Sequence, residues 1–514
     1  MTHLCVSIFV HDLAQAKRDI AAAVEAGADM VELRLDELED VDLIRRLVGE
    51  FEVGIVLTCR SASEGGHSEL PDEQRLRLVS EVAPGNDRVL IDFEHRALQR
   101  IGPADIRNRL IASFHDFAGR PPTLTRTYAE MLAGAGQIVK LAWMARSIRD
   151  NIEAFEILQS RQKPTIALCM GEAGLISRIL AKKFGAFLTF TALEKGAESA
   201  PGQVIIRDMK QLYRWDRIGP QTRVYGVVAC PVAHSMSPAV HNAAFDATGH
   251  DGVYLPMLVQ PGYESFKAFM EDFANYKPLH LRGLSITIPH KENALRYLQE
   301  KGARIDPLAV DIGAVNTIII DRDAAGNPVL GGINTDYQAI IDTICTAMQI
   351  TPQQLRDCRV AVIGAGGTGR TAVAALARLG ATVVVYNRTY ERAEALARAF
   401  DGRIGKVVAA RIEKLCDSCC QVYINTTSVG MHPNIDQSVF ANAPPRMEPT
   451  TLVFDTVYNP PKTKLLSQAE AAGAKTVGGI EMFVRQAAGQ FSAWTGLSPP
   501  MQLMRQIIQQ RLSV

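Results

Sequence analysis

Eight short apolar segments recur along residues 1–215, and each is followed by a stretch long enough for a helix or a long loop. The predicted strands span residues 6–10, 31–36, 53–59, 88–94, 109–114, 138–144, 165–170 and 187–193. Strands that alternate with helical connections favour a parallel sheet, and eight such units in succession favour a closed (β/α)8 barrel. We therefore predict an α/β protein whose first domain, residues 1–218, is a TIM barrel.

A short, turn-rich segment at 218–222 separates this domain from a second series of strands and helices. A tail over 203–208 leads to this segment through a predicted helix that ends near residue 217. Beyond it, we expect strands at 224–228, 253–258, 283–288, 315–320, 329–333, 360–363, 382–386, 421–424 and 451–455, helices near 337–348 and 482–495, and a last helix reaching the C-terminus. We divide this half into domains at 222–337, 338–484 and 485–514. The last consists of helices that return to the domain 222–337.

The composition argues against several classes of function. The basic and acidic side chains of the 514 residues balance to a net charge of zero, which disfavours a nucleic-acid or anionic-membrane surface. No apolar run approaches the roughly 18 residues of a membrane-spanning helix. Because the sequence enters the first strand almost at once, we expect no targeting segment before it. Nine scattered cysteines fit reduced thiols, so we expect a cytoplasmic protein. The cluster Cys416, Cys419 and Cys420 has no second Cys or His pair nearby, and no metal site is predicted.

A single lysine, Lys140, stands inside the apolar segment 138–144. Burying an ammonium among apolar side chains is costly unless the charge is paired or the amine is deprotonated. Lys140 is therefore either a structural lysine with a counter-ion or an amine kept partly neutral for chemistry. The residues that end the other strands favour the second alternative.

Charged and polar side chains accompany several of the other predicted barrel strands. In 31–36, Glu32, Arg34 and Asp36 share one face and apolar residues the other, a pattern that an edge strand with one wet face would also show. Because the active sites of TIM barrels lie where the strands end, we expect such residues to converge on one rim. The candidates are Glu32, Arg34, Arg60, Glu64, His115, Lys140, Arg178, Ser199 and Gln203.

The motifs of residues 1–215 resemble type I 3-dehydroquinate dehydratases. They are Glu32-Leu33-Arg34, Thr58-Cys59-Arg60 with Glu64, Ser113-Phe114-His115-Asp116-Phe117, Lys140, Ser177-Arg178 and Ser199-Ala200-Pro201-Gly202-Gln203. The resemblance implies that Lys140 attacks a ketone and forms an iminium, which acidifies the adjacent carbon–hydrogen bond. It also implies that His115 removes that proton and later protonates the departing hydroxyl, while Glu64 orients His115.

The same resemblance implies the substrate contacts. Arg178 would bind the carboxylate with its planar fork. The carboxylate or the ring hydroxyls would be held by Ser7, Glu32, Arg34, Arg60, Ser199 and Gln203. Since Lys140 must be neutral to attack, we expect Arg34, Arg60 and desolvation to favour its neutral form.

A glycine-rich loop, Gly364-Ala365-Gly366-Gly367-Thr368-Gly369, follows a predicted strand and opens a helix predicted over 370–379. In this context the G-x-G-x-x-G pattern predicts that 338–484 is a Rossmann domain with a dinucleotide site, the pyrophosphate lying at the helix N-terminus. The next strand ends in Asn387-Arg388-Thr389, with Arg392 shortly after. Two arginines and no acid favour the 2′-phosphate of NADP over NAD. The alternative is that both arginines are only solvated residues at a helix start.

An ordered series of motifs over 222–514 resembles shikimate dehydrogenases. It consists of Ser235-Met236-Ser237-Pro238, Ser285-Ile286-Thr287 with Lys291, Gly313-Ala314-Val315-Asn316-Thr317, Asn334-Thr335-Asp336, the glycine loop, Asn425-Thr426-Thr427-Ser428, Tyr458-Asn459-Pro460, and Gly479-Ile480-Glu481-Met482 with Gln486. The resemblance implies that Lys291 and Asp336 form the catalytic pair. Lys291 would supply a proton or stabilise an oxyanion, and Asp336 would keep it charged and oriented.

This resemblance also implies the binding residues of the second half. Those for the substrate are Ser235, Ser237, Thr287, Asn316, Tyr458 and Gln486. Those for NADP are Gly364, Ala365, Gly366, Gly367, Thr368, Gly369, Asn387, Arg388, Thr389, Arg392, Thr426, Gly479 and Met482. Two residues depart from the family pattern. Ser285 stands where many relatives have Asn, and Tyr337 stands where small residues are usual and would either crowd the site or shift the preference among shikimate-like substrates.

Together the two resemblances predict a bifunctional shikimate-pathway enzyme with the domain order of plant-type fusions. It would dehydrate 3-dehydroquinate to 3-dehydroshikimate and reduce that product to shikimate with NADPH. Two alternatives stay open: a preference for quinate or NAD in the second half, and a non-catalytic quinate-sensing regulator, which we expect to have lost catalytic residues. We expect small-molecule substrates, no nucleic-acid or membrane partner, and a monomer in preference to a dimer.

Overall fold

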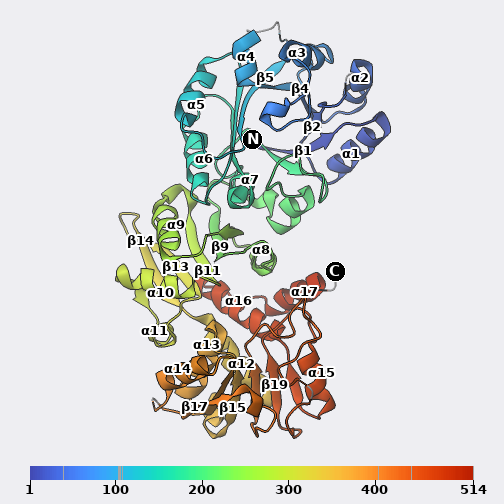
Figure 1. Ribbon diagram of the computed structural model, residues 1–514. Coiled ribbons are helices and arrows are strands. Elements are labelled where there is room, and N and C mark those ends of the chain that lie inside the picture. The colour runs from blue at the N-terminus through green and yellow to red at the C-terminus, as the bar shows by residue number, and fades with distance from the viewer. Residues whose placement is uncertain (39, 102–105, 107, 403, 442, 513–514) are drawn as a thin grey trace. The chain divides into compact units, whose positions relative to one another are not determined.

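The computed structural model describes every residue except 39, 102–105, 107, 403, 442 and 513–514. The chain divides into two compact units (Figure 1). The first comprises Met1–Ser235 and Asp251–Leu281, and the second comprises Met236–His250 and Arg282–Val514. Among the described residues, none of the helices is both long and apolar enough to cross a membrane.

The first unit begins with an eight-stranded parallel barrel, which confirms the predicted fold. Its strands are β1 (His3–Phe9), β2 (Met30–Arg34), β3 (Gly54–Thr58), β4 (Val89–Glu94), β5 (Arg109–Asp116), β6 (Ile138–Met144), β7 (Thr165–Met170) and β8 (Leu188–Ala192). Neighbours follow the order β7-β6-β5-β4-β3-β2-β1-β8. The Phe187 N–H donates to the Thr165 carbonyl at 2.8 Å, which brings the start of β8 beside β7 and nearly closes the sheet.

Helices follow the first seven strands and surround the barrel (Figure 1). They are α1 (Leu13–Glu25), α2 (Val41–Glu50), α3 (Asp72–Glu81), α4 (His95–Ile101), α5 (Leu124–Ala133), α6 (Asp150–Gln159) and the short α7 (Leu175–Ile179). The helix predicted to end near residue 217 is instead a π-helical turn, Asp208–Leu212, followed by a 3-10 turn, Trp215–Arg217. That prediction was therefore wrong in type, although its position was right.

Apolar side chains fill much of the barrel interior. Those from all eight strands form one cluster: Cys5, Met30, Val56, Leu90, Ile111, Ile138, Ala142, Ile166, Leu168, Met170, Leu188 and Phe190. Side chains alternate along a strand, so Lys140 points to the same side as Ile138 and Ala142. Trp143 on the opposite face is fully buried. The strand sequence therefore directs Lys140 into the barrel, between two members of the apolar cluster.

Two further strands and a helix complete the first unit. β9 (Arg223–Ala229) and β10 (Gly252–Leu258) pair in parallel over their whole length, and α9 (Tyr263–Asn275) follows β10. The predicted strands at 224–228 and 253–258 are thus confirmed.

The second unit contains four more strands and several helices. β11 (Leu281–Ile286), β13 (Thr317–Arg322) and β14 (Pro328–Ile333) pair antiparallel, and the two-residue β12 (Arg304–Ile305) adds to β14 in parallel. The helices are α8 (Ser237–Ala247), α10 (Lys291–Glu300), α11 (Pro307–Ile312) and α12 (Thr335–Met348).

A six-stranded parallel sheet forms the other part of the second unit. Its strands are β15 (Arg359–Ile363), β16 (Thr382–Asn387), β17 (Val407–Arg411), β18 (Val422–Asn425), β19 (Leu452–Asp455) and β20 (Lys475–Val477), in the order β17-β16-β15-β18-β19-β20. The helices are α13 (Gly367–Arg378), α14 (Tyr390–Phe400), α15 (Lys464–Ala471), α16 (Gly479–Thr495) and α17 (Met501–Leu512). The strand order reverses between β15 and β18, as in a Rossmann fold, which confirms the prediction.

Candidate active sites

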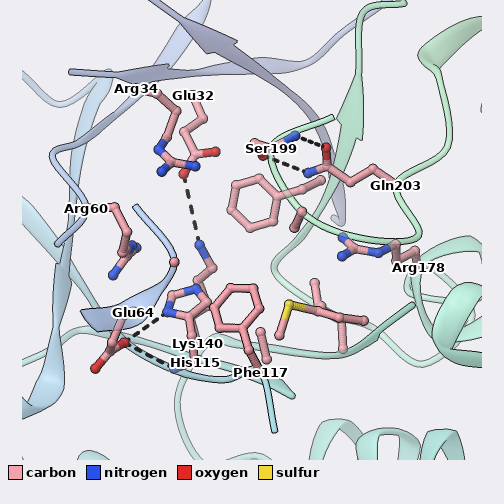
Figure 2. Close-up of a pocket in the computed structure, with 16 residues that line it drawn as sticks. Glu32, Arg34, Arg60, Glu64, His115, Phe117, Lys140, Arg178, Ser199 and Gln203 are labelled. Carbon is pink, nitrogen blue, oxygen red and sulfur yellow. Dashed lines mark hydrogen bonds and ion pairs between the residues drawn. The ribbon is translucent and has the colours of Figure 1, made fainter. Parts of the chain in front are cut away.

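A pocket opens at the carboxyl ends of the barrel strands (Figure 2). It is lined by Glu32, Arg34, Arg60, Glu64, Gly65, His115, Phe117, Lys140, Ala142, Leu168, Met170, Arg178, Phe190, Ser199, Ala200 and Gln203. All nine rim candidates from the sequence are among them. The predicted contact Ser7 lies just behind the pocket and donates its hydroxyl to Glu32 Oε2 at 2.6 Å. Phe117, 40% exposed, is the most open of the aromatic residues here.

Lys140 is 5% exposed and has a carboxylate partner. Its Nζ donates to Asp92 Oδ2 at 2.7 Å, lies 4.0 Å from Glu32 Oε1, and is 4.1 Å from the centre of the Phe190 ring. Asp92 is therefore a buried carboxylate counter-ion of Lys140, placed between it and Arg60.

Asp92 and Glu94 were missed by the sequence analysis. Arg60 donates to Asp92 Oδ1 at 2.6 Å and to Ser113 Oγ at 2.8 Å, and lies 3.7 Å from Glu94. Burial alone would raise the pKa of Asp92, but the charges of Arg60 and Lys140 hold it well below its ordinary value. The available signal was the alternation of two acids at 92 and 94 in an apolar strand, the same pattern that had drawn attention to Glu32.

His115 and Glu64 form a buried dyad. His115 Nδ1 lies 3.1 Å from Glu64 Oε2, and the His115 backbone N–H donates to the same oxygen at 3.2 Å. Burial, with Arg60 and Lys140 nearby, lowers the pKa of His115 well below its ordinary value. Burial raises the pKa of Glu64 to about 7; Arg60 opposes this shift and Glu94 adds to it. The imidazole is thus neutral near pH 7, where Glu64 titrates.

Arg178 reaches into the pocket from the side opposite Arg60 (Figure 2). It is 2% exposed, its NH2 group donates weakly to the Pro201 carbonyl at 3.4 Å, and its buried Nε has no hydrogen-bond partner among the described residues. Within that same part of the chain it forms no ion pair. Burial lowers the pKa of Arg178 to about 10, so the side chain stays cationic at neutral pH. A buried guanidinium without a counter-ion fits an anionic ligand.

The remaining pocket residues are held by one another. Glu32 Oε1 accepts from Thr58 Oγ1 at 2.9 Å, and Arg34 forms a two-pronged pair with Asp36 at 3.2 and 2.6 Å. Ser199 and Gln203 exchange hydrogen bonds at 2.8 and 2.9 Å. Each of these polar groups therefore has a fixed orientation before any ligand arrives.

In the second unit, Lys291 and Asp336 are in direct contact. Lys291 Nζ donates to Asp336 Oδ2 at 2.6 Å. Lys291 starts α10, and Asp336 lies in the first turn of α12, where the Asn334 side chain accepts from the Asp336 N–H at 3.1 Å. Two helix starts therefore bring together residues that are 45 positions apart.

Asn316 lies beside this pair through a hydrogen-bond network. Its Oδ1 accepts from the Thr335 N–H at 2.8 Å, and its Nδ2 donates to Thr335 Oγ1 at 3.0 Å. Gln490, which the sequence analysis missed, accepts from Ser285 Oγ at 2.7 Å and donates to the Asn316 carbonyl at 3.3 Å. Ser285 is therefore bound to α16 in this chain.

The other predicted substrate contacts are distributed over several elements. Ser237 begins α8, Thr287 follows β11, and Gln486 lies on α16. Tyr458 packs edge-on against Phe483, with ring centres 5.4 Å apart, and burial raises the pKa of its phenol. Ser235 belongs to the first unit. Tyr337 is a half-buried residue that packs on the Rossmann core.

The glycine loop has the backbone geometry of a phosphate cradle. Gly364 has φ +113°, and a Cβ there would lie 2.6 Å from Thr426 Oγ1; a Cβ at Gly369 would lie 2.2 Å from the Gly364 carbonyl oxygen. A Cβ at Gly366 or Gly367 would meet nothing within 4 Å. The first pair thus permits close packing, while the second leaves the start of α13 open for a pyrophosphate.

The two arginines predicted to select NADP lie next to this loop. Asn387 ends β16 and accepts from the Ala365 N–H at 3.3 Å, so the loop and the strand end are joined. Arg388, Thr389 and Arg392 follow and are exposed. Gly479 starts α16, and a Cβ there would lie 2.3 Å from the Thr456 carbonyl oxygen; Met482 packs in the Rossmann core.

All nine cysteines are free thiols. Across the described part of the chain, no group of three or more His, Cys, Asp or Glu side chains is placed to hold a metal ion.

Family comparisons divide the chain into four matched segments. The matches are type I 3-dehydroquinase over residues 4–220, shikimate dehydrogenase substrate binding domain over 227–318, shikimate/quinate 5-dehydrogenase over 346–468, and shikimate 5′-dehydrogenase C-terminal domain over 479–509. A solved shikimate dehydrogenase in complex with NADP+ matches 57% of this chain and 96% of its own length, at 32% identity and a TM-score of 0.50.

Two curated relatives show the same division. The NADP+ shikimate dehydrogenase of Methanosarcina barkeri is 38% identical over 57% of this chain and 99% of its own length. The chloroplastic bifunctional 3-dehydroquinate dehydratase/shikimate dehydrogenase of Arabidopsis thaliana is 38% identical over 98% of this chain and 84% of its own length. The chain therefore belongs to the family of bifunctional 3-dehydroquinate dehydratase/shikimate dehydrogenases.

Proposed function

We propose that the barrel dehydrates 3-dehydroquinate through a Schiff base on Lys140, and that the second half reduces the product to shikimate with NADPH. The observation that carries the proposal is that one pocket holds Lys140, the His115–Glu64 dyad and the unpaired Arg178. A substrate that carries a ketone and a carboxylate needs an amine to attack the ketone, a base to remove a proton and a cation to bind the carboxylate. The functional division follows the domains 1–218, 222–337, 338–484 and 485–514.

In the dehydratase reaction, Lys140 attacks the ketone carbon once a proton has left its ammonium. Loss of the carbonyl oxygen as water gives a cationic iminium, so the positive charge at this position is retained. Asp92, 2.7 Å from Nζ, is the counter-ion for that charge before and after the attack. The iminium withdraws electrons from the neighbouring carbon and makes its hydrogen acidic.

His115 acts on that acidic hydrogen. With Glu64 ionised, the Nδ1–H of His115 donates to the Glu64 carboxylate, which leaves the other ring nitrogen free to accept the proton. The imidazolium then returns the proton to the departing hydroxyl, and water releases the product from Lys140. Arg178 holds the substrate carboxylate, while Ser7, Glu32, Arg34, Arg60, Ser199 and Gln203 orient the ring.

The raised pKa of Glu64 predicts the pH dependence of the dehydratase. Below about pH 7 Glu64 is protonated and no longer holds Nδ1–H, so kcat should rise as pH increases through 7. In Glu64→Gln the rise of kcat across pH 7 should disappear, and kcat should fall by about 10- to 100-fold. Steady-state rates from pH 5 to 9 test this, with the exposed Glu73→Gln as control. A wild-type rate that is flat across pH 7 would contradict the assignment.

In the reductase reaction, bound NADPH would be the source of the hydride for the ketone carbon of 3-dehydroshikimate. Lys291 donates a proton to the ketone oxygen or stabilises its developing negative charge, and Asp336 keeps Lys291 charged and oriented. Ser235, Ser237, Thr287, Asn316, Tyr458 and Gln486 hold the substrate. The backbone of Gly364–Gly369 receives the pyrophosphate, with Asn387, Thr389, Thr426, Gly479 and Met482 around the cofactor.

Arg388 and Arg392 should select NADPH through its 2′-phosphate. Each lost charge-assisted hydrogen bond costs about 1.5–3 kcal/mol, so Arg388→Gln with Arg392→Gln should raise the KM for NADPH by roughly 100-fold or more. The kcat/KM for NADH should change little, because NADH lacks this phosphate. The control is Arg398→Gln, because Arg398 is exposed and lies on α14, the helix that also carries Arg392. Equal losses with both cofactors would argue against 2′-phosphate recognition.

One assay tests the whole proposal. Incubation of the protein with 3-dehydroquinate and NADPH should yield shikimate and NADP+ in equal amounts, identified by mass spectrometry. Accumulation of 3-dehydroshikimate without cofactor oxidation would refute the reductase, and no turnover at all would favour the regulator. The enzyme relatives and the intact catalytic pairs disfavour that alternative. The other alternative is a preference for quinate or NAD. It is tested by comparing the oxidation rates of quinate and shikimate with NADP+ and with NAD+.

We further propose a cytoplasmic monomer. The nine free thiols support a reducing compartment, and one chain carries both proposed sites without a partner. Substrates are small molecules, and the zero net charge gives no support for nucleic-acid or membrane binding.

A further inference from the structure

Arg178 is carried by α7, a helix of only five residues. On one side the barrel holds this helix. The buried Asn151 donates to the Ala173 carbonyl at 2.8 Å and accepts from the Ser177 N–H at 3.2 Å, while Ser177 Oγ accepts from the Cys169 N–H at 2.9 Å. These contacts secure the start of α7 but leave its other side to different elements.

That other side faces residues outside the barrel. Both α7 and the 3-10 turn before it, Glu172–Gly174, contact β10. β10 and α9 lie within 227–318, the segment matched by the shikimate dehydrogenase substrate binding domain. The helix that carries Arg178 is therefore enclosed between the barrel and part of the dehydrogenase half, all within the first unit.

The segment directly after α7 is anchored in the same way. Lys183, 5% exposed, donates to the carbonyls of Pro220 and Thr222 at 2.7 and 2.9 Å and lies 3.2 Å from His280 Nδ1. Lys183 has no carboxylate partner within the described ranges, so main-chain oxygens of the interdomain segment satisfy its buried ammonium. The chain on the C-terminal side of Arg178 is thus fixed to residues that lie beyond the barrel.

An aromatic stack secures the next residue. Phe184 and Phe155 stack with ring centres 4.0 Å apart, and Tyr276, just after α9, packs 6.2 and 6.4 Å from them. The Tyr276 hydroxyl donates to Gln159 Oε1 at 2.7 Å. Arg149, at the start of α6, also forms an ion pair with Asp272, which lies one helical turn before Tyr276 on α9.

We propose that β10 and the segment 276–280 of the dehydrogenase half position α7, so that the dehydratase depends on them to bind its substrate carboxylate through Arg178. The proposal rests on the proposed function, in which Arg178 binds that carboxylate. Bidentate recognition requires the guanidinium plane to be placed within a fraction of an ångström. A five-residue helix supported on one side only does not impose that precision. Tyr276, Lys183 and β10 are positioning elements, since none of them is in the pocket lining.

The test uses the full-length chain with Tyr276→Ala and Lys183→Met. Each should raise the KM for 3-dehydroquinate by about 10-fold, with kcat within twofold, because the reacting groups stay in place. Discrimination between 3-dehydroquinate and its carboxamide should fall by a similar factor. A general loss of stability would not change that ratio of kcat/KM values. Tyr276→Phe, which keeps the ring stack, should restore most of the wild-type behaviour.

Two further variants distinguish the possible failures. Glu264→Gln, an exposed change in α9, should leave the dehydratase at wild-type values. Arg178→Met should lose the carboxylate preference; if it does not, the proposed role of Arg178 is wrong. If Arg178→Met loses that preference while Tyr276→Ala and Lys183→Met keep it, the barrel alone positions α7 and the present inference is overturned.

Discussion

Lys140→Met should abolish the dehydratase, lowering kcat by at least about 10³-fold, and leave the reductase intact. Methionine fills a similar volume but cannot attack a ketone, so the covalent route is lost. Asp92 keeps its hydrogen bond from Arg60, and the pocket should therefore retain its fold. The measurement is product formation from 3-dehydroquinate, with NADPH oxidation on added 3-dehydroshikimate as the internal standard.

Chemical trapping gives this prediction a second readout. Borohydride reduces an iminium to a stable amine, so wild-type protein treated with 3-dehydroquinate and borohydride should gain the mass of the reduced adduct. Peptide mapping should place that adduct on the segment containing Lys140. Lys17→Ala, a change in an exposed ion pair, should trap as well as wild type. An adduct of undiminished yield in Lys140→Met would refute the Schiff base at this position.

Lys291→Ala should have the complementary effect. The reductase kcat should fall by about 10²- to 10⁴-fold, because Lys291 is the group proposed to give a proton to the ketone oxygen. The KM for NADPH should stay near its wild-type value, since the cofactor is bound by other elements. With 3-dehydroquinate as substrate, the variant should accumulate 3-dehydroshikimate at the wild-type dehydratase rate.

The partner of Lys291 separates proton transfer from simple binding. Asp336→Asn removes the charge 2.6 Å from Nζ and keeps the shape of the side chain. It should lower kcat by about 10-fold or more, because the carboxylate no longer holds the Lys291 side chain in place. For Lys291→Ala the matched control is Lys301→Ala, because Lys301 lies at the other end of the same helix, α10. A Lys291→Ala variant that lost only affinity for shikimate would contradict a role in proton transfer.

The sequence was sufficient for the architecture because hydrophobic periodicity dominates it. The eight barrel strands were located within a few residues, since each is an apolar run bounded by turn residues. The strands β12, β17 and β20 were missed. β12 and β20 have two and three residues, too few for any periodicity, and the run of small side chains in β17 is equally compatible with a helix.

The site was predictable where the chemistry was local and not where it depended on pairing across strands. Lys140 drew attention because a lysine in an apolar strand is costly. Its counter-ion, Asp92, lies 48 residues away on β4, and only the barrel geometry brings the two together. The same holds for Gln490, which reaches Ser285 from 205 residues away. Arg178 has no ion-pair partner among the residues that the structure describes, and this too is a property of the folded chain that the sequence does not show.

The apolar barrel interior has a consequence for how this chain could change over evolutionary time. The apolar cluster, from Cys5 to Phe190, supplies part of the buried surface that stabilises the barrel, and the charged side chains of the pocket occupy other positions of the same strands. A substitution among the charged residues therefore alters the reaction and leaves most of the buried apolar surface untouched. Such a barrel can lose or exchange its chemistry and still fold, so inactive or repurposed descendants are an accessible outcome.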